Sequence, residues 1–208
     1  MRPYKGKDFG VSSGPSLLLL GESHYLPNYS TQHLVSADWY NGTSATLSND
    51  ELEWINTAKT MVDHRAANFR NKALSIWKNS FWEINEYGPR FADYKCVADH
   101  ICSYNFFLRP AVQGKSLIVS RQDVEMANAA FRVHFEKLKP TAIIFLSRLA
   151  SRHFHNPSSY AAPVISTPHP GCKWWNKVAK SYGNKRGRDV LADFIKIKTT
   201  GWPQSSTN

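Results

Sequence analysis

Several short apolar runs, separated by segments with helical periodicity, constrain the fold of this chain more than any other feature. Residues 17–20, 142–146 and 164–166 are too short for helices and are typical of buried strands, and a further strand is expected within residues 96–108. Strands that alternate with helices along a chain pair in parallel, and helices then cover both faces of the sheet. We therefore expect an α/β fold, a three-layer sandwich with a mostly parallel sheet of about four strands flanked by helices.

The helices are expected over residues 48–86, 121–137 and 147–155, with a final helix that begins near Trp174 and is interrupted at residues 183–187. Ser48 or Asn49 can cap the first of these segments by accepting a hydrogen bond from a free backbone amide. The aromatic residues of that segment are expected to pack in the core or between helices rather than to hold a cofactor. They are Trp54, Phe69, Trp77, Phe81 and Trp82.

The chain has 208 residues, of which 42% are hydrophobic, and this is enough for one well-filled domain. We expect that domain to span residues 15–200. A poorly ordered arm rich in Gly, Ser and Lys is expected at residues 1–14, and a disordered tail at residues 201–208. The long polar stretch at residues 26–48 is expected to be a functional or mobile loop.

The sequence also argues against several classes of protein. No apolar run approaches the roughly 20 residues that cross a bilayer, and the first residues lack the apolar stretch of a signal peptide, so we expect a cytoplasmic monomer that does not bind membranes. Three cysteines, Cys96, Cys102 and Cys172, match no common zinc or disulfide framework and are expected to be reduced. No set of histidines and carboxylates has metal-site spacing, and no Walker loop or dinucleotide fingerprint occurs. We therefore expect neither a metal nor a cofactor.

The net charge of +10 is concentrated in the second half of the chain. Residues 1–104 contain 10 Lys/Arg and 11 Asp/Glu, whereas residues 105–208 contain 16 Lys/Arg and 5 Asp/Glu. Such an asymmetry is typical of a face that binds a polyanion. Nucleic acid is therefore the expected partner, and the alternative is a soluble protein that is merely basic.

Two polar motifs directly follow predicted strands. Gly21-Glu22-Ser23-His24-Tyr25 follows residues 17–20, and His169-Pro170-Gly171 follows residues 164–166. In an open α/β sheet, ligands bind in the crevice beyond the carboxyl ends of the strands. The two motifs are therefore expected to converge on one pocket.

This pattern resembles the uracil-DNA glycosylase superfamily, whose members carry a glycine-led loop after the first strand and a His-Pro-Ser-type loop after the last. The resemblance extends to Asn105, which closes a middle strand, and to the strand region at residues 139–146, and it covers most of residues 15–198. It implies a monofunctional DNA glycosylase that flips a damaged or modified pyrimidine out of the DNA and hydrolyses its N-glycosidic bond, with uracil as the default substrate.

The resemblance also implies roles for individual residues. His169 would donate a hydrogen bond to the pyrimidine O2, and Asn105 would read the Watson–Crick edge of the base. Ser23 stands where many members hold an aspartate that orients the attacking water, so Glu22 or His24 is the candidate for positioning water or stabilising the cationic sugar. The alternatives are that His169 caps the last helix and that Glu22 bonds backbone amides to shape its loop.

Further residues are candidates for contacts with the base and with DNA. Tyr25 stands where members of the superfamily place a tyrosine against C5 of the base, and Trp39, Tyr40 or Phe106 is expected to stack on the base. Trp174 is the candidate wedge for the gap that the flipped base leaves, unless it packs in the core. The candidate phosphate contacts are Lys173, Lys177, Lys180, Lys185, Arg186 and Arg188.

Two other functions stay open from the sequence. The altered loop Glu22-Ser23-His24 is compatible with a glycosylase that accepts C5-modified bases of phage DNA, which would give a role in defence. The absent loop aspartate is also compatible with a member of the fold that binds DNA or nucleotides without catalysis.

Overall fold

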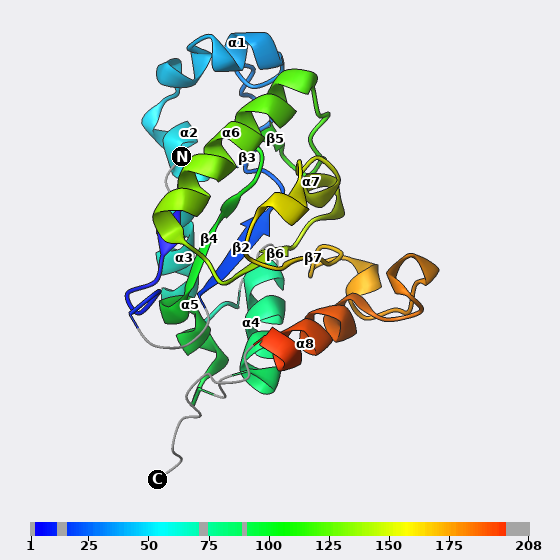
Figure 1. Ribbon diagram of the computed structural model, residues 1–208. Coiled ribbons are helices and arrows are strands. Elements are labelled where there is room, and N and C mark those ends of the chain that lie inside the picture. The colour runs from blue at the N-terminus through cyan, green and yellow to red at the C-terminus, as the bar shows by residue number, and fades with distance from the viewer. Residues whose placement is uncertain (1–2, 12–15, 71–74, 89–90, 199–208) are drawn as a thin grey trace.

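The structure, a computed structural model, describes residues 3–11, 16–70, 75–88 and 91–198 (Figure 1). Its centre is a five-stranded sheet in the order β1-β4-β2-β6-β7. The strands are β1 (Tyr4–Lys5), β4 (Ile101–Asn105), β2 (Leu17–Gly21), β6 (Ala142–Phe145) and β7 (Val164–Ser166). Only β1 runs antiparallel to its neighbour. The expected α/β fold with a mostly parallel sheet flanked by helices is confirmed, with one strand more than the sequence suggested.

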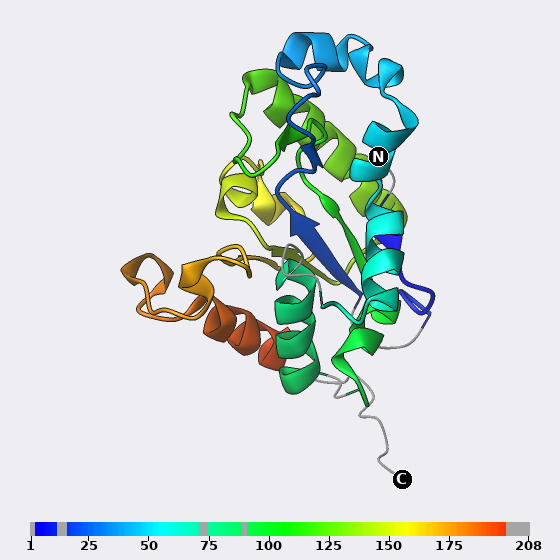
Figure 2. The same cartoon turned by 180° about the vertical axis from the view of Figure 1, so that it is seen from behind.

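Helices pack against both faces of this sheet (Figures 1 and 2). The helices on one face are α3 (Thr57–Ala66), α4 (Ser75–Tyr87), α5 (Val97–His100) and α8 (Gly187–Lys198), and those on the other are α6 (Arg121–Leu138) and α7 (Arg148–Arg152). Beyond the end of β2 lie α1 (Ser36–Tyr40), α2 (Asn49–Trp54) and a second sheet of β3 (Tyr25–Leu26) and β5 (Ala111–Val112). The 3-10 helices are η1 (Thr43–Thr46), η3 (Tyr94–Cys96), η4 (Pro157–Ser159), η5 (Lys173–Trp175) and η6 (Lys180–Tyr182). Among the described helices, none combines the length and apolarity that crossing a bilayer requires.

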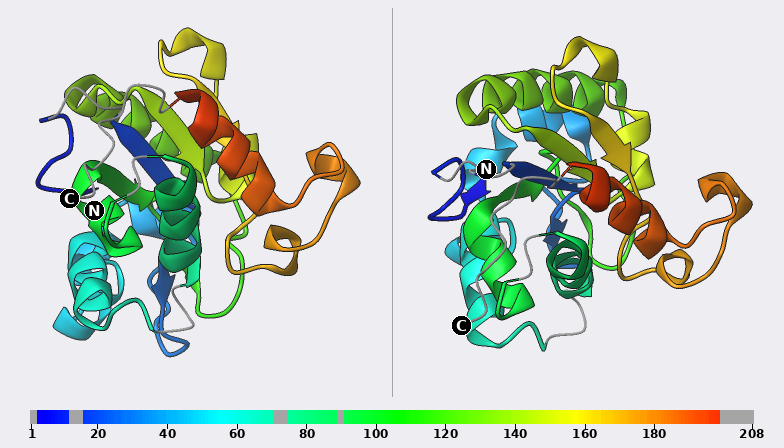
Figure 3. Two further views of the ribbon diagram at one scale, coloured as in Figure 1. Left: turned by 90° about the horizontal axis from the view of Figure 1, so that it is seen from below. Right: turned by 60° about the horizontal axis from the view of Figure 1, so that its bottom comes forward.

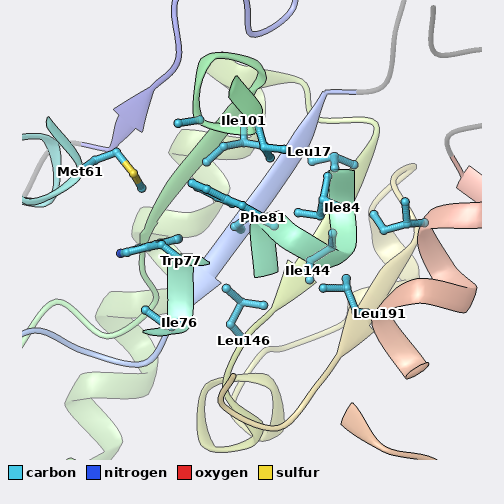
Figure 4. Close-up of a cluster of buried hydrophobic side chains, with 14 of the residues drawn as sticks. Leu17, Met61, Ile76, Trp77, Phe81, Ile84, Ile101, Ile144, Leu146 and Leu191 are labelled. Atoms are coloured by element: carbon cyan, nitrogen blue, oxygen red, sulfur yellow. The ribbon is translucent and has the colours of Figure 1, made fainter. Parts of the chain in front are cut away.

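Strand β2 joins the two hydrophobic cores. Side chains alternate between the faces of a strand, so the four leucines of β2 divide between the two sides. Leu17 and Leu19 pack with Phe81 of α4 in one cluster (Figure 4), whereas Leu18 and Leu20 pack with Phe131 of α6 in the other. All four leucines are fully buried, which explains why this strand is a continuous apolar run rather than an alternating one.

Side-chain caps set the starts of two helices. Ser48 accepts a hydrogen bond from the Glu51 amide, and the Glu51 carboxylate accepts one from the Ser48 amide, so α2 begins with a capping box. Ser120 and Asp123 form the same arrangement at the start of α6. The predicted helix start at Ser48 is therefore confirmed, and so is the predicted helix at residues 121–137.

Two expectations about the ends of the domain are wrong in part. Residues 3–11 of the expected flexible arm include β1, and Phe9 is buried in the core, because Tyr4 and Lys5 complete the open edge of β4. The final helix begins at Gly187 and not near Trp174, because Gly183 and Asn184 both adopt left-handed conformations that a continuing helix does not accommodate. The expected tail at residues 201–208 lies outside the described residues.

The aromatic residues of residues 48–86 divide into two groups. Phe69, Trp77 and Phe81 are buried in the core, as expected. Trp82 is 52% exposed, but its ring packs between elements against Tyr94 of η3, with 5.8 Å between the ring centroids. Trp54 is 37% exposed, so the expected packing is incomplete for Trp54.

A buried ion pair attaches the segment after β4 to the start of α6. Arg109 donates to both carboxylate oxygens of Asp123 at 2.9 and 2.7 Å, and it also donates to the carbonyl oxygens of His33 and Ile118 at 2.7 and 2.8 Å. Burial acts to raise the pKa of Asp123, but the hydrogen bonds from Arg109 and Ser120 outweigh it and lower that pKa. The pair therefore holds three chain segments around one charged centre.

Asp123→Asn is expected to lower the free energy of unfolding by about 3–5 kcal/mol, because it leaves the buried Arg109 guanidinium without its counter-charge. Glu125→Gln on the same helix is the matched control. It removes an exposed pair with Arg121, and pairs of that kind contribute about 0.3–0.5 kcal/mol. Urea denaturation measures both variants, and equal costs would contradict the role given to Asp123.

Candidate functional site

The candidate site lies at the carboxyl ends of β2, β4, β6 and β7, which meet at one edge of the sheet. From β2 the chain first adds β4 on one side and then crosses to add β6 on the other. The strand order therefore reverses between β2 and β6, and in open α/β sheets ligands bind outside such a point. The first predicted motif follows β2, and the second follows β7.

Gly21 and Asn105 touch at this edge. They are register partners in the β2–β4 pair, and a Cβ built on Gly21 would lie only 2.1 Å from Asn105 Oδ1. Glycine is therefore required here by close approach and not by a left-handed backbone. The Asn105 amide is partly buried and makes no hydrogen bond with any described residue. Its donor and acceptor are free for a ligand.

The Glu22 carboxylate bridges the loops after β2 and β6. Its Oε2 accepts a hydrogen bond from Ser147 Oγ at 2.8 Å, and its Oε1 accepts one from the Leu117 amide at 3.4 Å. Ser147 directly follows the β6 region and also caps α7 through the Ala150 amide. These bonds fix the direction of the carboxylate, as the alternative structural interpretation of Glu22 anticipated, and they place it at the reversal point of the strand order.

The His169 loop is held by its own backbone and by α4. His169 Nδ1 accepts a hydrogen bond from the Gly171 amide at 3.0 Å, and Asn79 donates to the Pro170 carbonyl oxygen at 2.8 Å. A Cβ on Gly171 would lie 2.7 Å from Ser75 Oγ and 3.1 Å from the imidazole, so a larger residue would disturb the loop. Because Nδ1 is an acceptor, a neutral His169 carries its proton on Nε2.

Electrostatics links His169 to the first motif. His169 is exposed at the surface, but desolvation of its ring by the surrounding protein lowers its pKa, and the Glu22 carboxylate opposes that shift, so the two groups are close enough to interact. Burial and Glu22 together raise the pKa of Tyr25, which keeps its phenol neutral. His169 Nε2 makes no hydrogen bond within the described part of the chain, so a neutral N–H donor is available beside a carboxylate.

Four sequence-predicted residues lie away from this arrangement. His24 is 8% exposed, and its Nε2 lies 2.9 Å from Thr57 Oγ1 at the start of α3, so its position does not support the expectation that it acts on a ligand. Phe106 is fully buried among Phe107, Phe145 and Phe154 and has no face open to a base.

Tyr40 and Trp39 belong to the packing of α1. Tyr40 donates to Asp123 Oδ1 at 3.0 Å, and Trp39 is buried in a small cluster with Leu26 and Leu47. The proposed stacking roles of Tyr40 and Trp39 are therefore not supported by their positions. Tyr25, which is 43% exposed, is the aromatic residue of the first motif that reaches the surface.

The predicted DNA contacts divide into free and paired groups. Trp174 is 42% exposed, with Lys173 Nζ 4.8 Å from the centre of its ring, whereas Trp175 is buried in the core. Lys177 is exposed and has no carboxylate partner among the described residues. Lys185 pairs with Asp193 at 2.6 Å and Arg186 with Asp189 at 2.7 Å, so their charges are already compensated.

Sequence reasoning missed the residues that support the motifs. Ser147 carries the same signal as the motifs, a polar residue directly after an apolar run, but the sequence assigns it only to the helix expected at residues 147–155. Asn79 gives no local signal, because its contact with Pro170 depends on how α4 packs against the loop after β7. Within residues 3–11, 16–70, 75–88 and 91–198, no three His, Cys, Asp or Glu side chains form a group that would hold a metal.

A cavity of about 400 Å³ adjoins the Glu22 side of the site. Its lining includes Arg109, Lys115 and Leu117, and the Leu117 amide bonds Glu22. Asn105 and His169 do not line it. This cavity therefore does not join the two motifs. Comparison of the chain with known protein families and with curated proteins finds no match.

Gly21→Ala is expected to displace the Asn105 side chain and to destabilise the protein by about 1–3 kcal/mol, because the added methyl group has no space. Asn105→Ala removes the clashing oxygen, so Gly21→Ala should cost much less in that background. A double-mutant cycle by urea denaturation measures the coupling. Additive costs would show that the two residues are not in contact.

His24 is expected to make stability depend on pH. Burial lowers the pKa of His24 from 6.5 to about 4, so between these pH values the unfolded chain binds a proton that the folded protein does not. The resulting stabilisation is complete above pH 6.5 and is lost as the pH falls toward 4, by about 3 kcal/mol at 1.36 kcal/mol per pKa unit. His24→Gln, which retains a polar group beside Thr57, should flatten this part of the curve. Identical pH dependence of unfolding in both proteins would rule out this role.

Proposed function

We propose that the protein is a DNA glycosylase that binds an extruded pyrimidine between Asn105 and His169 and hydrolyses its N-glycosidic bond. The observation that carries the proposal is that one edge of the sheet holds three groups: the Asn105 amide against Gly21, without a hydrogen-bond partner among the described residues, the free Nε2 of His169, and the Glu22 carboxylate. On this proposal the architecture is the three-layer sandwich of the uracil-DNA glycosylase superfamily, which the helices on both faces of the sheet support.

Asn105 selects the base in this proposal. Its carbonyl oxygen accepts from N3–H of uracil, and its amide donates to O4. Cytosine presents the opposite pattern and is disfavoured. Because the Asn105 side chain packs on Gly21, its orientation is restricted before a base arrives, which is what a selective reader requires.

His169 acts on the departing base. As the glycosidic bond breaks, its electron pair moves to the base and negative charge develops on O2. A neutral imidazole donates Nε2–H to that oxygen, and the bond from Gly171 to Nδ1 aims it. The lowered pKa favours this neutral form near pH 7.

Glu22 acts on the sugar. Positive charge develops on C1′ and its ring oxygen, a water molecule adds at C1′ and loses a proton to solvent, and the base anion takes up a proton from solvent, which leaves an abasic site and the free base. A carboxylate held by Ser147 and Leu117 stabilises that positive charge without moving. Tyr25, next to Glu22, is the candidate for contacting C5 of the base.

His169→Ala is expected to reduce the rate of uracil release by about 10²–10³-fold, the usual cost of removing one donor to a developing oxyanion. His24→Gln is the matched control, because His24 contacts Thr57 instead and its loss should leave the rate within about twofold at pH 7.5. Labelled uracil-containing DNA is incubated with each protein and then treated with alkali to break abasic sites. The panel includes hydroxymethyluracil and other C5-modified pyrimidines. Absence of release from every substrate would refute the proposal.

A non-catalytic DNA reader is the second candidate. It is favoured by Ser23 in place of an aspartate and by the two hydrogen bonds that occupy Glu22. This candidate predicts DNA binding with no base release, and no change in that result on His169→Ala.

A further inference from the structure

A long part of the chain around the site contains no acidic residue. Residues 137–188 include ten Lys/Arg and no Asp or Glu. Their positive charges can therefore be balanced only by carboxylates from elsewhere in the fold. A cation that pairs with such a carboxylate has a structural role. A cation without one remains available to a ligand.

Three of the ten cations are paired within the protein. Lys185 pairs with Asp193, Arg186 with Asp189, and Arg188 with the buried Glu83, at 2.6, 2.7 and 2.6 Å. The other seven have no carboxylate partner among the described residues. Lys137 and Lys139 precede β6 and lie at the amino edge of the sheet, away from the site. The remaining five follow β6 or β7 at the carboxyl edge; they are Arg148, Arg152, Lys173, Lys177 and Lys180.

Contacts join the two segments that carry these five residues. The Arg148 guanidinium of α7 lies 5.0 Å from the centre of the Tyr182 ring, at the end of η6. Arg148 and Arg152 both act to lower the pKa of Tyr182, which burial raises, so both cations are near that ring. Arg148 also directly follows Ser147, the partner of Glu22. The segment from η5 to η6 projects from the body of the protein in Figures 1 and 3.

We infer that Arg148 and Arg152, with Lys173, Lys177 and Lys180, form a surface that binds the phosphates of a DNA strand as it passes the His169 loop. This inference rests on the proposed function. It differs from the phosphate contacts expected from the sequence, because it adds Arg148 and Arg152 of α7 and omits the three cations that are paired with carboxylates. A planar guanidinium stacked on an aromatic ring is held in place before binding, and it presents its N–H donors to phosphate oxygens. The surface faces the edge where the base is proposed to enter.

The test is the salt dependence of binding to a duplex that contains no removable base. Each phosphate contact contributes about 0.9 to the slope of log affinity against log salt concentration. Arg148→Gln with Arg152→Gln should lower that slope by up to about 2, measured by fluorescence anisotropy. The matched double variant, Lys185→Gln with Arg186→Gln, removes the same charge and should change the slope by less than half as much. Lys137→Gln, at the opposite sheet edge, should leave the slope unchanged.

Arg148→Lys separates charge from stacking. It should retain the slope while lowering the affinity several-fold, because an ammonium lacks the planar fork that stacks on Tyr182. Equal slopes in the test and control doubles, or no salt-dependent binding by the unmodified protein, would overturn the inference. Salt-dependent binding with the expected difference between the two doubles, but without base release, would count against the glycosylase proposal alone. Base release together with equal slopes in the two doubles would count against this surface alone.

Discussion

Strand β2 depends on having a parallel neighbour on each side, and the rest of the structure follows from that requirement. Its four leucines are fully buried, so neither face of the strand meets water, and the backbone groups at its two edges pair with β4 and β6. The chain covers the two edges of β2 by placing β4 on one side and then crossing over to place β6 on the other. The connections therefore diverge beyond Gly21, and the polar groups that follow the strands are left facing a common space. The candidate site is a consequence of how the central strand is buried.

Local signals account for the parts of the fold that the sequence predicted well. The strand at residues 164–166 and the helix start at Ser48 depend on apolar runs and on a capping box, which involve neighbouring residues only. The failures depend on distant partners. Tyr4 and Lys5 become a strand only because β4 offers an open edge almost one hundred residues later in the chain. The late start of α8 depends on the left-handed turn at Gly183 and Asn184, within a loop closed by pairing of Ala179 with Lys185.

The same distinction holds within the site. Asn105 and Gly21 lie side by side because register in a parallel sheet fixes which strand ends are neighbours. The direction of the chain after Gly21 is not fixed by register. It enters the small sheet at Tyr25, which turns His24 toward Thr57 and leaves Tyr25 at the surface. Side chains beyond a strand end therefore need tertiary contacts to be placed, and Glu22 and His169 are placed by Ser147 and Gly171.

The replacement of a loop aspartate by Ser23 need not abolish the proposed reaction. When the glycosidic bond is largely broken before water adds, the sugar is already a strong electrophile, and a base that removes the proton of water contributes less than a charge that stabilises the cation. Glu22 is suited to the second task and poorly suited to the first, because hydrogen bonds from Ser147 and Leu117 already occupy both of its oxygens. Five cations of residues 137–188 that have no carboxylate partner in the described part of the chain follow β6 or β7 at this edge, so in the proposed mechanism a fixed carboxylate there also offsets their repulsion of a positive sugar. In the proposed mechanism, Ser23 and the fixed Glu22 are thus two parts of one electrostatic arrangement, in which a negative charge would face the sugar and a neutral donor would face the base.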